Sequence, residues 1–255
     1  MILAIDIGNT SISLGVFQQD KLLKKWRIHS DSEQTADEYA LILLDLITWA
    51  KIKEEDIEGA IISSVVPPLT PIFQQVTRQL FSKRALVVGP GLKTGMAILY
   101  ENPQEVGADR VVAAVAAFHK YGGPLVVVDF GTATTFDAIS SQGDYLGGAI
   151  APGIEMAAQA LYEKTAKLPR IEIRQPASVI GKTTEGSMQA GLFYGYQGLV
   201  EGILREMKQV LGPTTKVVMT GGWAEFFSKQ EKANVYHEPD LVLDGLRLLY
   251  EKNRR

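Results

Sequence analysis

The segment Leu125-Val-Val-Val-Asp-Phe-Gly-Thr-Ala-Thr-Thr-Phe-Asp137 repeats the chemistry of an earlier segment, Ile2-Leu-Ala-Ile-Asp-Ile-Gly-Asn-Thr-Ser-Ile-Ser-Leu14. Each begins as an apolar run, which is typical of a buried β-strand, and then reaches Asp-x-Gly. Small hydroxyl and amide side chains follow in both, and strand-like alternation returns. When the acids are aligned, the segments match at four positions: Asp6 with Asp129, Gly8 with Gly131, Asn9 with Thr132 and Ser11 with Thr134.

A hairpin of this kind has the groups needed to hold a phosphate and its cation. Glycine lets backbone N–H groups approach phosphate oxygens, hydroxyls donate further hydrogen bonds, and the carboxylate binds a hard cation directly or through water. One copy alone is also the commonest signal of an ordinary hairpin. Two copies in the same order, one in each half of the chain, favour a duplicated domain that closes over one nucleotide.

The composition excludes several classes of function. The chain has 255 residues, enough for one large domain or two smaller ones, and its 46% hydrophobic and 22% charged residues are usual for a globular enzyme. A net charge of −3 argues against nucleic acid as the main partner. Cysteine is absent, which excludes disulfides and thiolate chemistry, and the three histidines do not form a zinc-binding pair. We find no signal peptide and no membrane-length apolar run, so the expected location is the cytoplasm.

Strands and helices alternate along the chain. Thr35-Ala-Asp-Glu38 is a capping box that predicts the start of a helix, and Thr70-Pro71 predicts another start with Thr70 as the cap. Apolar patterns predict further strands at 59–66, 85–88, 145–150 and 216–222, and further helices at 108–119 and 240–250. This order predicts an α/β protein with mixed sheets flanked by helices. We expect two domains, 1–118 and 119–255, with the final helix free to pack back on the first.

The segment from Thr184 to Leu211 is predicted to be helical although it contains five glycines: Gly186, Gly191, Gly195, Gly198 and Gly202. Each glycine lowers helix stability, so their number indicates close packing against another helix or another subunit. Two helices with a break between them would explain the segment equally well.

A third glycine turn, Thr220-Gly221-Gly222, follows a predicted strand. Paired glycines would let a flat group such as adenosine lie against the backbone, giving a layout of two phosphate turns and one adenosine turn. Taken alone, these residues are better explained as a helix N-terminus with two glycines. No Gly-x-x-x-x-Gly-Lys-[Ser/Thr] motif occurs and no Gly-x-Gly-x-x-Gly motif follows a strand, which argues against P-loop and dinucleotide folds.

A candidate general base lies in the segment from Tyr100 to Arg110, which joins the two predicted halves. A buried Asp109 could take a proton from a substrate hydroxyl, and Arg110 beside it would attract an anionic substrate or a phosphate. The alternative is that Asp109 caps the following helix and Arg110 is exposed to solvent. Because aspartate is a common N-cap, spacing alone favours the cap.

Together these motifs resemble those of the type III pantothenate kinases, members of the actin-like ATPase and sugar-kinase superfamily, over nearly the whole chain. The matching motifs are Asp6-x-Gly8-Asn9-Thr10, Tyr100 with Pro103, Gly107-x-Asp109-Arg110, Asp129-x-Gly131-Thr132-Ala133-x-Thr135, Gly147-Gly148-x-Ile150-x-Pro152-Gly153 and Thr220-Gly221-Gly222. Asp-x-Gly-Asn-Thr is shared across the superfamily, whereas Gly-x-Asp-Arg followed by Asp-x-Gly-Thr-Ala is specific. The resemblance implies two similar domains of the actin-like ATPase (ribonuclease H-like) fold, with the nucleotide in the cleft between them.

The resemblance also implies phosphorylation of the primary hydroxyl of pantothenate by ATP, the first committed step to coenzyme A. A divalent cation (Mg²⁺) would accompany ATP, a monovalent cation (K⁺ or NH₄⁺) would be required, and the chain would be a homodimer with no nucleic-acid or membrane partner. The resemblance makes Asp109 the proton acceptor and Asp129 the potassium ligand. Pantothenate would be contacted by Tyr100, Gly107, Ala108, Asp109, Arg110 and Thr184. The nucleotide would be contacted by Asp6, Ile7, Gly8, Asn9, Thr10, Ser11, Ile12, Ser13, Thr132, Gly221 and Gly222.

Two rival functions stay open. One is a kinase for another small alcohol such as a sugar, although sugar kinases of the superfamily are usually much longer and Gly-x-Asp-Arg favours pantothenate. The other is a nucleotide-binding regulatory protein of the same fold with little catalysis, against which the intact Asp109 argues.

Overall fold

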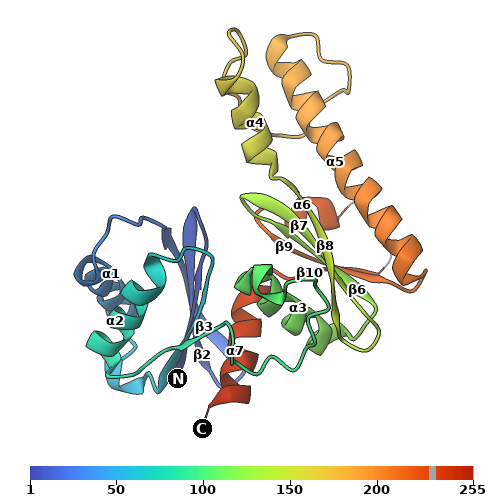
Figure 1. The fold of residues 1–255 in the computed structure, drawn as a ribbon. Helices are drawn as coiled ribbons and strands as arrows, with labels where there is room; N and C mark the ends of the chain where they lie inside the picture. The colour runs from blue at the N-terminus through green and yellow to red at the C-terminus, as the bar shows by residue number, and fades with distance from the viewer. Residues whose placement is uncertain (230–233, 255) are drawn as a thin grey trace. The chain divides into compact units, whose positions relative to one another are not determined.

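The computed structural model of the chain describes residues 1–229 and 234–254. Its contacts divide the chain into two compact units: the first joins Met1–Lys120 to the segment that begins at Asp240, and the second is Tyr121–Pro239. In Figure 1 the first unit therefore contains the blue N-terminal elements and the red C-terminal helix. The last helix of the chain thus completes the unit that the first residues begin.

The sheet of the first unit has five strands in the order β3-β2-β1-β4-β5. They are β1 (Ile2–Ile7), β2 (Ser11–Gln18), β3 (Lys21–His29), β4 (Gly59–Ser64) and β5 (Leu86–Val87). The first three form an antiparallel meander, whereas β4 runs parallel to β1 and β5 parallel to β4. Because side chains alternate along a strand, β1 buries Leu3, Ile5 and Ile7 on one face and Ala4 on the other.

Helices cover both faces of this sheet. α1 (Ala36–Trp49) and α2 (Leu69–Phe81) pack on the Leu3 face, where Tyr39 and Phe73 join the core. α3 (Ala108–Tyr121) and α7 (Leu241–Asn253) supply Val112 and Leu246 to the core on the Ala4 face. Two short 3₁₀-helices, η1 (Glu54–Asp56) and η2 (Pro103–Glu105), lie in the connections.

One predicted helix start is confirmed and one is wrong. Thr35 begins α1 with the expected capping box: its hydroxyl accepts from the Glu38 N–H (3.4 Å) and its own N–H donates to Glu38 Oε2 (2.7 Å). α2 instead begins at Leu69 after Pro68, so Thr70 lies inside the first turn and does not cap it. The fixed φ of proline prepares the backbone for this helix without a hydroxyl cap.

The second unit repeats the topology of the first, with strand order β10-β9-β6-β7-β8. Its strands are β6 (Leu125–Phe130), β7 (Ala133–Ile139), β8 (Tyr145–Pro152), β9 (Lys216–Gly221) and β10 (Val235–His237). Again three strands form an antiparallel meander, and β9 runs parallel to β6 and β10 parallel to β9. β6 therefore takes the place of β1, β7 that of β2 and β9 that of β4. The predicted duplication of an α/β domain with a mixed sheet is confirmed.

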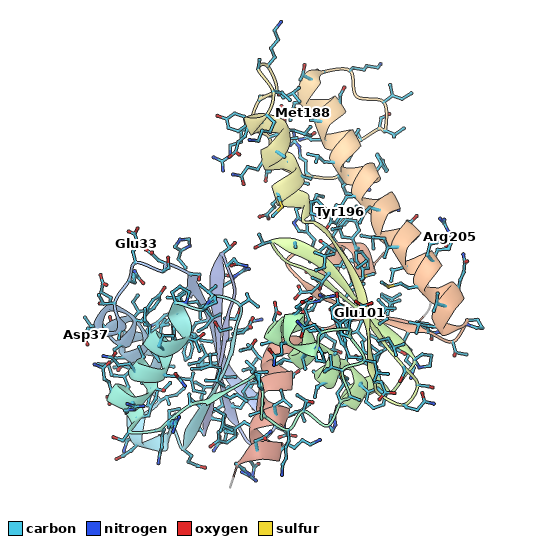
Figure 2. The ribbon with its side chains drawn as sticks, viewed as in Figure 1. Glu33, Asp37, Glu101, Met188, Tyr196 and Arg205 are labelled. Carbon is cyan, nitrogen blue, oxygen red and sulfur yellow. The ribbon has the colours of Figure 1, made fainter. Side chains whose placement is uncertain are left out.

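Within its described residues, the second unit carries three helices, α4 (Ile154–Glu163), α5 (Thr184–Leu211) and α6 (Ala224–Ser228). α5 is continuous, so the alternative of two separate helices is wrong. Its inner side packs on the sheet through Tyr196 and Val200, whereas the Arg205 side chain is exposed (Figure 2). Of the helices within residues 1–229 and 234–254, none is both long and apolar enough to cross a membrane.

Candidate active site

A row of polar side chains crosses the first sheet near the end of its central strand. On the face that carries Ala4, the pairing of β2, β1 and β4 places Ser13, Asp6 and Ser63 side by side. Ser63 is fully buried, and Asp6 is partly buried. The Asp6 carboxylate therefore belongs to a row in which both cross-strand neighbours carry hydroxyls.

The second sheet repeats this row. The pairing of β7, β6 and β9 aligns Thr135, Asp129 and Thr220, so the carboxylate again stands between two hydroxyl residues. Oxygen-rich surroundings of this kind suit hard cations. Sequence patterns indicated both aspartates but missed Ser63, because nothing local to β4 tells which of its residues pairs with Asp6.

The two Asp-x-Gly turns differ in length by one residue. The first turn comprises residues 8–11 and the second only residues 131–133. The predicted correspondence of Ser11 with Thr134 was therefore wrong. Because a shift of one residue moves a side chain to the opposite face, Thr134 is buried, and its hydroxyl forms a hydrogen bond with that of Tyr196.

Each turn is closed by its glycine. The Gly8 N–H donates to the Ser11 carbonyl (3.1 Å), and the Gly131 N–H donates to the Ala133 carbonyl (3.2 Å). In the first turn the Ser11 hydroxyl also accepts a hydrogen bond from Arg27 Nε on β3 (2.7 Å). No local sequence pattern indicates Arg27, because its place beside the turn depends on the register of β2 with β3.

Two further glycines allow the backbone to approach the second turn closely. Gly221 has a φ of +90°, and a Cβ at this position would lie 2.6 Å from Asp129 Oδ1. The Gly153 N–H donates to the Thr132 carbonyl (3.1 Å), and a Cβ at Gly153 would lie 2.3 Å from that oxygen. The glycine pair directly precedes α6, as the helix-terminus alternative expected, but Trp223 holds the N-cap position and neither glycine is the cap itself.

Asp109 is the second residue of α3 and is partly buried. Its Oδ1 accepts a hydrogen bond from the Arg110 N–H (2.8 Å). Burial raises the pKa of Asp109 above its ordinary value, and the N–H and charge of Arg110 offset part of that rise. The Gly107 carbonyl accepts from the Val111 N–H (3.2 Å), so the N-cap position falls at Gly107 and Asp109 is not the helix cap.

The start of α3 lies beside the end of β4. A Cβ at Gly107 would lie 3.6 Å from Cγ1 of Val65, which follows that strand. α3 also packs on the face of the sheet that carries Ala4 and Asp6. The first unit therefore brings Asp109 to the same end and the same face of the sheet as the Asp6 row.

The other predicted substrate residues are placed separately. Tyr100 is 37% exposed and precedes η2, and Arg110 is partly buried in α3. Thr184 is in the second unit, where it begins α5 after Thr183, whose hydroxyl accepts from the Gly186 N–H (3.0 Å). Thr184 lines a cavity of about 930 Å³ between α4 and the start of α5.

Gly107→Ala is expected to impair the site without unfolding the protein. The added Cβ would lie 2.5 Å from Asp109 Oδ1, so the flexible carboxylate must move rather than the backbone. A misplacement of about 1 Å at a catalytic group can lower the rate about 10²-fold. Steady-state kinetics and thermal unfolding check this, with Gly89→Ala as the control, because no described atom lies within 4 Å of a Cβ at Gly89. Equal rates for the two variants would contradict the prediction.

Known structures define the fold. An inorganic polyphosphate/ATP-glucomannokinase from Arthrobacter sp. strain KM superposes with a TM-score of 0.51 at 14% identity, covering 99% of both chains. An activator of 2-hydroxyisocaproyl-CoA dehydratase from Clostridium difficile, solved with bound ADPNP, superposes with a TM-score of 0.53 at 12% identity, covering 98% of this chain and 94% of the other. At such identities the likeness concerns the fold alone, which is the two-domain fold of the actin-like ATPases and sugar kinases.

Sequence comparison then identifies the family. The family model described as type III pantothenate kinase matches residues 2–206. A type III pantothenate kinase from Moorella thermoacetica is 50% identical over 253 residues, which cover 99% of this chain and 100% of that protein. The chain belongs to the type III pantothenate kinase family.

Proposed function

We propose that the protein transfers the γ-phosphoryl group of ATP to the primary hydroxyl of pantothenate, giving 4′-phosphopantothenate for coenzyme A synthesis. The observation that carries this proposal is the position of Asp109, a carboxylate of raised pKa held at the same end and face of the sheet as the Asp6 row. A base beside a phosphate-binding turn is the arrangement that phosphorylation of an alcohol requires.

The nucleotide is assigned to the glycine turns. In this proposal ATP is contacted by the turn from Asp6 to Ser13 of the first unit, and by Thr132, Gly221 and Gly222 of the second. Ile7 and Ile12 of the first turn are fully buried in the core, so the contacts fall on the other residues of the turn. Asn9, Thr10, Thr132 and the two glycines are exposed to solvent. Because phosphoryl transfer needs little covalent help, these residues act by positioning the phosphates in line with the acceptor.

The residues present fit the cations that the family implies. Mg²⁺ is usually held by one or two carboxylates together with substrate phosphates, and Asp6 with its hydroxyl neighbours provides such a ligand set. K⁺ or NH₄⁺ is assigned to Asp129, which stands between Thr135 and Thr220. A bound cation would neutralise phosphate charge in turns whose own sequences contain no lysine.

On the acceptor side, Asp109 takes the proton of the pantothenate hydroxyl. Arg110 supplies a positive charge beside it for the pantothenate carboxylate, and Tyr100, Gly107, Ala108 and Thr184 complete the contacts. The raised pKa of Asp109 makes the carboxylate a stronger proton acceptor than an exposed aspartate.

A coupled assay of ADP release tests this function against its rivals. Release that depends on pantothenate supports the proposal. Release that depends on a sugar and not on pantothenate would identify a kinase for another alcohol. Nucleotide binding without release under either condition would favour a regulatory protein.

We also propose that the chain is a homodimer built on α5. Gly191, Gly195, Gly198 and Gly202 follow one side of this helix, and no described atom lies within 4 Å of a Cβ at any of them. The close helix packing predicted from these glycines is therefore absent within the described chain. A second copy would bring a helix backbone against this side, with Thr184 at the start of the same helix.

A size series at Gly195 tests the dimer. Gly195→Ala and Gly195→Leu both improve helix propensity and have room within the chain, so the folded monomer should tolerate both. At a helix contact the larger side chain should separate the subunits, and sedimentation should show dimer for alanine and mainly monomer for leucine. An active wild-type monomer at assay concentration would refute the proposal.

A further inference from the structure

The polar row of the first sheet extends to a cation on the neighbouring strand. Arg27 of β3 pairs with Ser13 of β2, which in turn pairs with Asp6 of β1. Cross-strand partners present their side chains on the same face, so the guanidinium of Arg27 and the carboxylate of Asp6 stand on one face of the sheet. Arg27 is exposed to solvent, and so are Asn9 and Thr10 of the first turn.

Arg27 is also bonded directly to the first Asp-x-Gly turn. Its Nε donates to the Ser11 hydroxyl at 2.7 Å, which ties the side chain to the residue whose carbonyl accepts from the Gly8 N–H. One N–H of the guanidinium is used in this bond, and the planar group keeps the N–H groups of its two terminal nitrogens. Within the described residues, Arg27 forms no ion pair with a carboxylate.

Lys25, two residues earlier on the same face of β3, has a different environment. It forms an ion pair with Asp240, the residue before α7. The ion pair neutralises the charge of Lys25 within the chain and links β3 to the residue before α7. The charge of Arg27 is not neutralised in this way, although it lies beside a turn built for phosphate.

We propose that Arg27 is a nucleotide-binding residue that donates from its terminal guanidinium nitrogens to a phosphate oxygen of ATP. A guanidinium matches phosphate geometry with two parallel hydrogen bonds and stays charged at every working pH. It supplies the positive charge that the turn lacks in its own sequence. This inference rests on the proposed nucleotide role of the Asp6 to Ser13 turn.

The experiment compares Arg27→Ala with Lys25→Ala, since each removes one positive charge from the same face of the same strand. The dissociation constant of Mg-ATP is measured by calorimetry, and KM for ATP and for pantothenate by coupled assay. Arg27→Ala should weaken Mg-ATP binding about tenfold to a hundredfold, the range for loss of hydrogen bonding to a charged group, with KM for pantothenate unchanged. The affinity of Arg27→Lys for Mg-ATP should lie between those of the wild type and Arg27→Ala, because lysine keeps the charge but cannot form the two parallel hydrogen bonds. Lys25→Ala should bind Mg-ATP like the wild type.

A double-mutant cycle with Ser11→Ala separates direct contact from an effect through the turn. If Arg27→Ala does not weaken Mg-ATP binding any further in the Ser11→Ala background, Arg27 acts only by holding Ser11, and the proposal is overturned. Equal Mg-ATP affinity in Arg27→Ala and Lys25→Ala overturns it as well. Failure of the proposed function would be seen separately, as wild-type protein that releases no ADP on addition of pantothenate, while the calorimetric comparison still decides the role of Arg27.

Discussion

Asp109→Asn is expected to lower turnover by about 10²–10⁴-fold, the usual range for loss of a positioned general base. Asparagine has the same shape, so the fold and pantothenate binding should be kept. A dissociative transition state transfers the proton late, which places the loss toward the lower end of the range. Steady-state kinetics, pantothenate binding and circular dichroism check these expectations.

Asp37→Asn is the matched control for this substitution. Asp37 is the second residue of α1, as Asp109 is of α3. Its Oδ1 accepts a hydrogen bond from Gln79 Nε2 in the same unit (3.0 Å). The control should retain normal turnover. If Asp109→Asn also turned over normally, Asp109 would be a structural residue of the first helical turn and no base.

The pH dependence of the reaction should report the same carboxylate. Because burial raises the pKa of Asp109, kcat/KM should fall as the pH drops through that raised pKa, and this limb should be missing in Asp109→Asn. The stability of the folded protein depends on pH in the opposite direction to that given by a salt-bridged acid. Between the ordinary pKa of aspartate and the raised one, the folded protein binds more protons than the unfolded chain, so stability falls as the pH rises through this window. Asp109→Asn should thus be at least as stable as the wild type at neutral pH.

Asp129→Ala is expected to abolish activation by K⁺ or NH₄⁺ and to lower turnover by about 10²–10³-fold, the range for loss of one electrostatic stabiliser. In the wild type, K⁺ and NH₄⁺ should raise activity and Na⁺ should do so poorly, because an oxygen-lined site suits a large ion. Rates measured in potassium, ammonium and sodium chloride check this. Asp45→Ala removes the same charge from the exposed side of α1 and should keep the potassium response. Full wild-type activity in sodium alone would contradict the assignment of Asp129.

The sequence by itself determined the features that local chemistry controls. The two hairpins follow from apolar runs ending in Asp-x-Gly, and the start of α1 follows from the Thr35–Glu38 capping box, because each depends on residues a few positions apart. The duplication could be predicted from the sequence for the same reason, since both copies keep the aspartate and the glycine in the same order. The resemblance of motifs also indicated the family that sequence comparison then identified.

Only the tertiary structure decided which residues share the site. Ser63 stands beside Asp6 because β4 pairs in parallel with β1, and Arg27 joins the same row through the register of β3. The match of Ser11 with Thr134 failed because the second turn is one residue shorter, a difference visible only in the strand pairing. Pairing between distant segments depends on how whole sheets pack, so no local pattern specifies it.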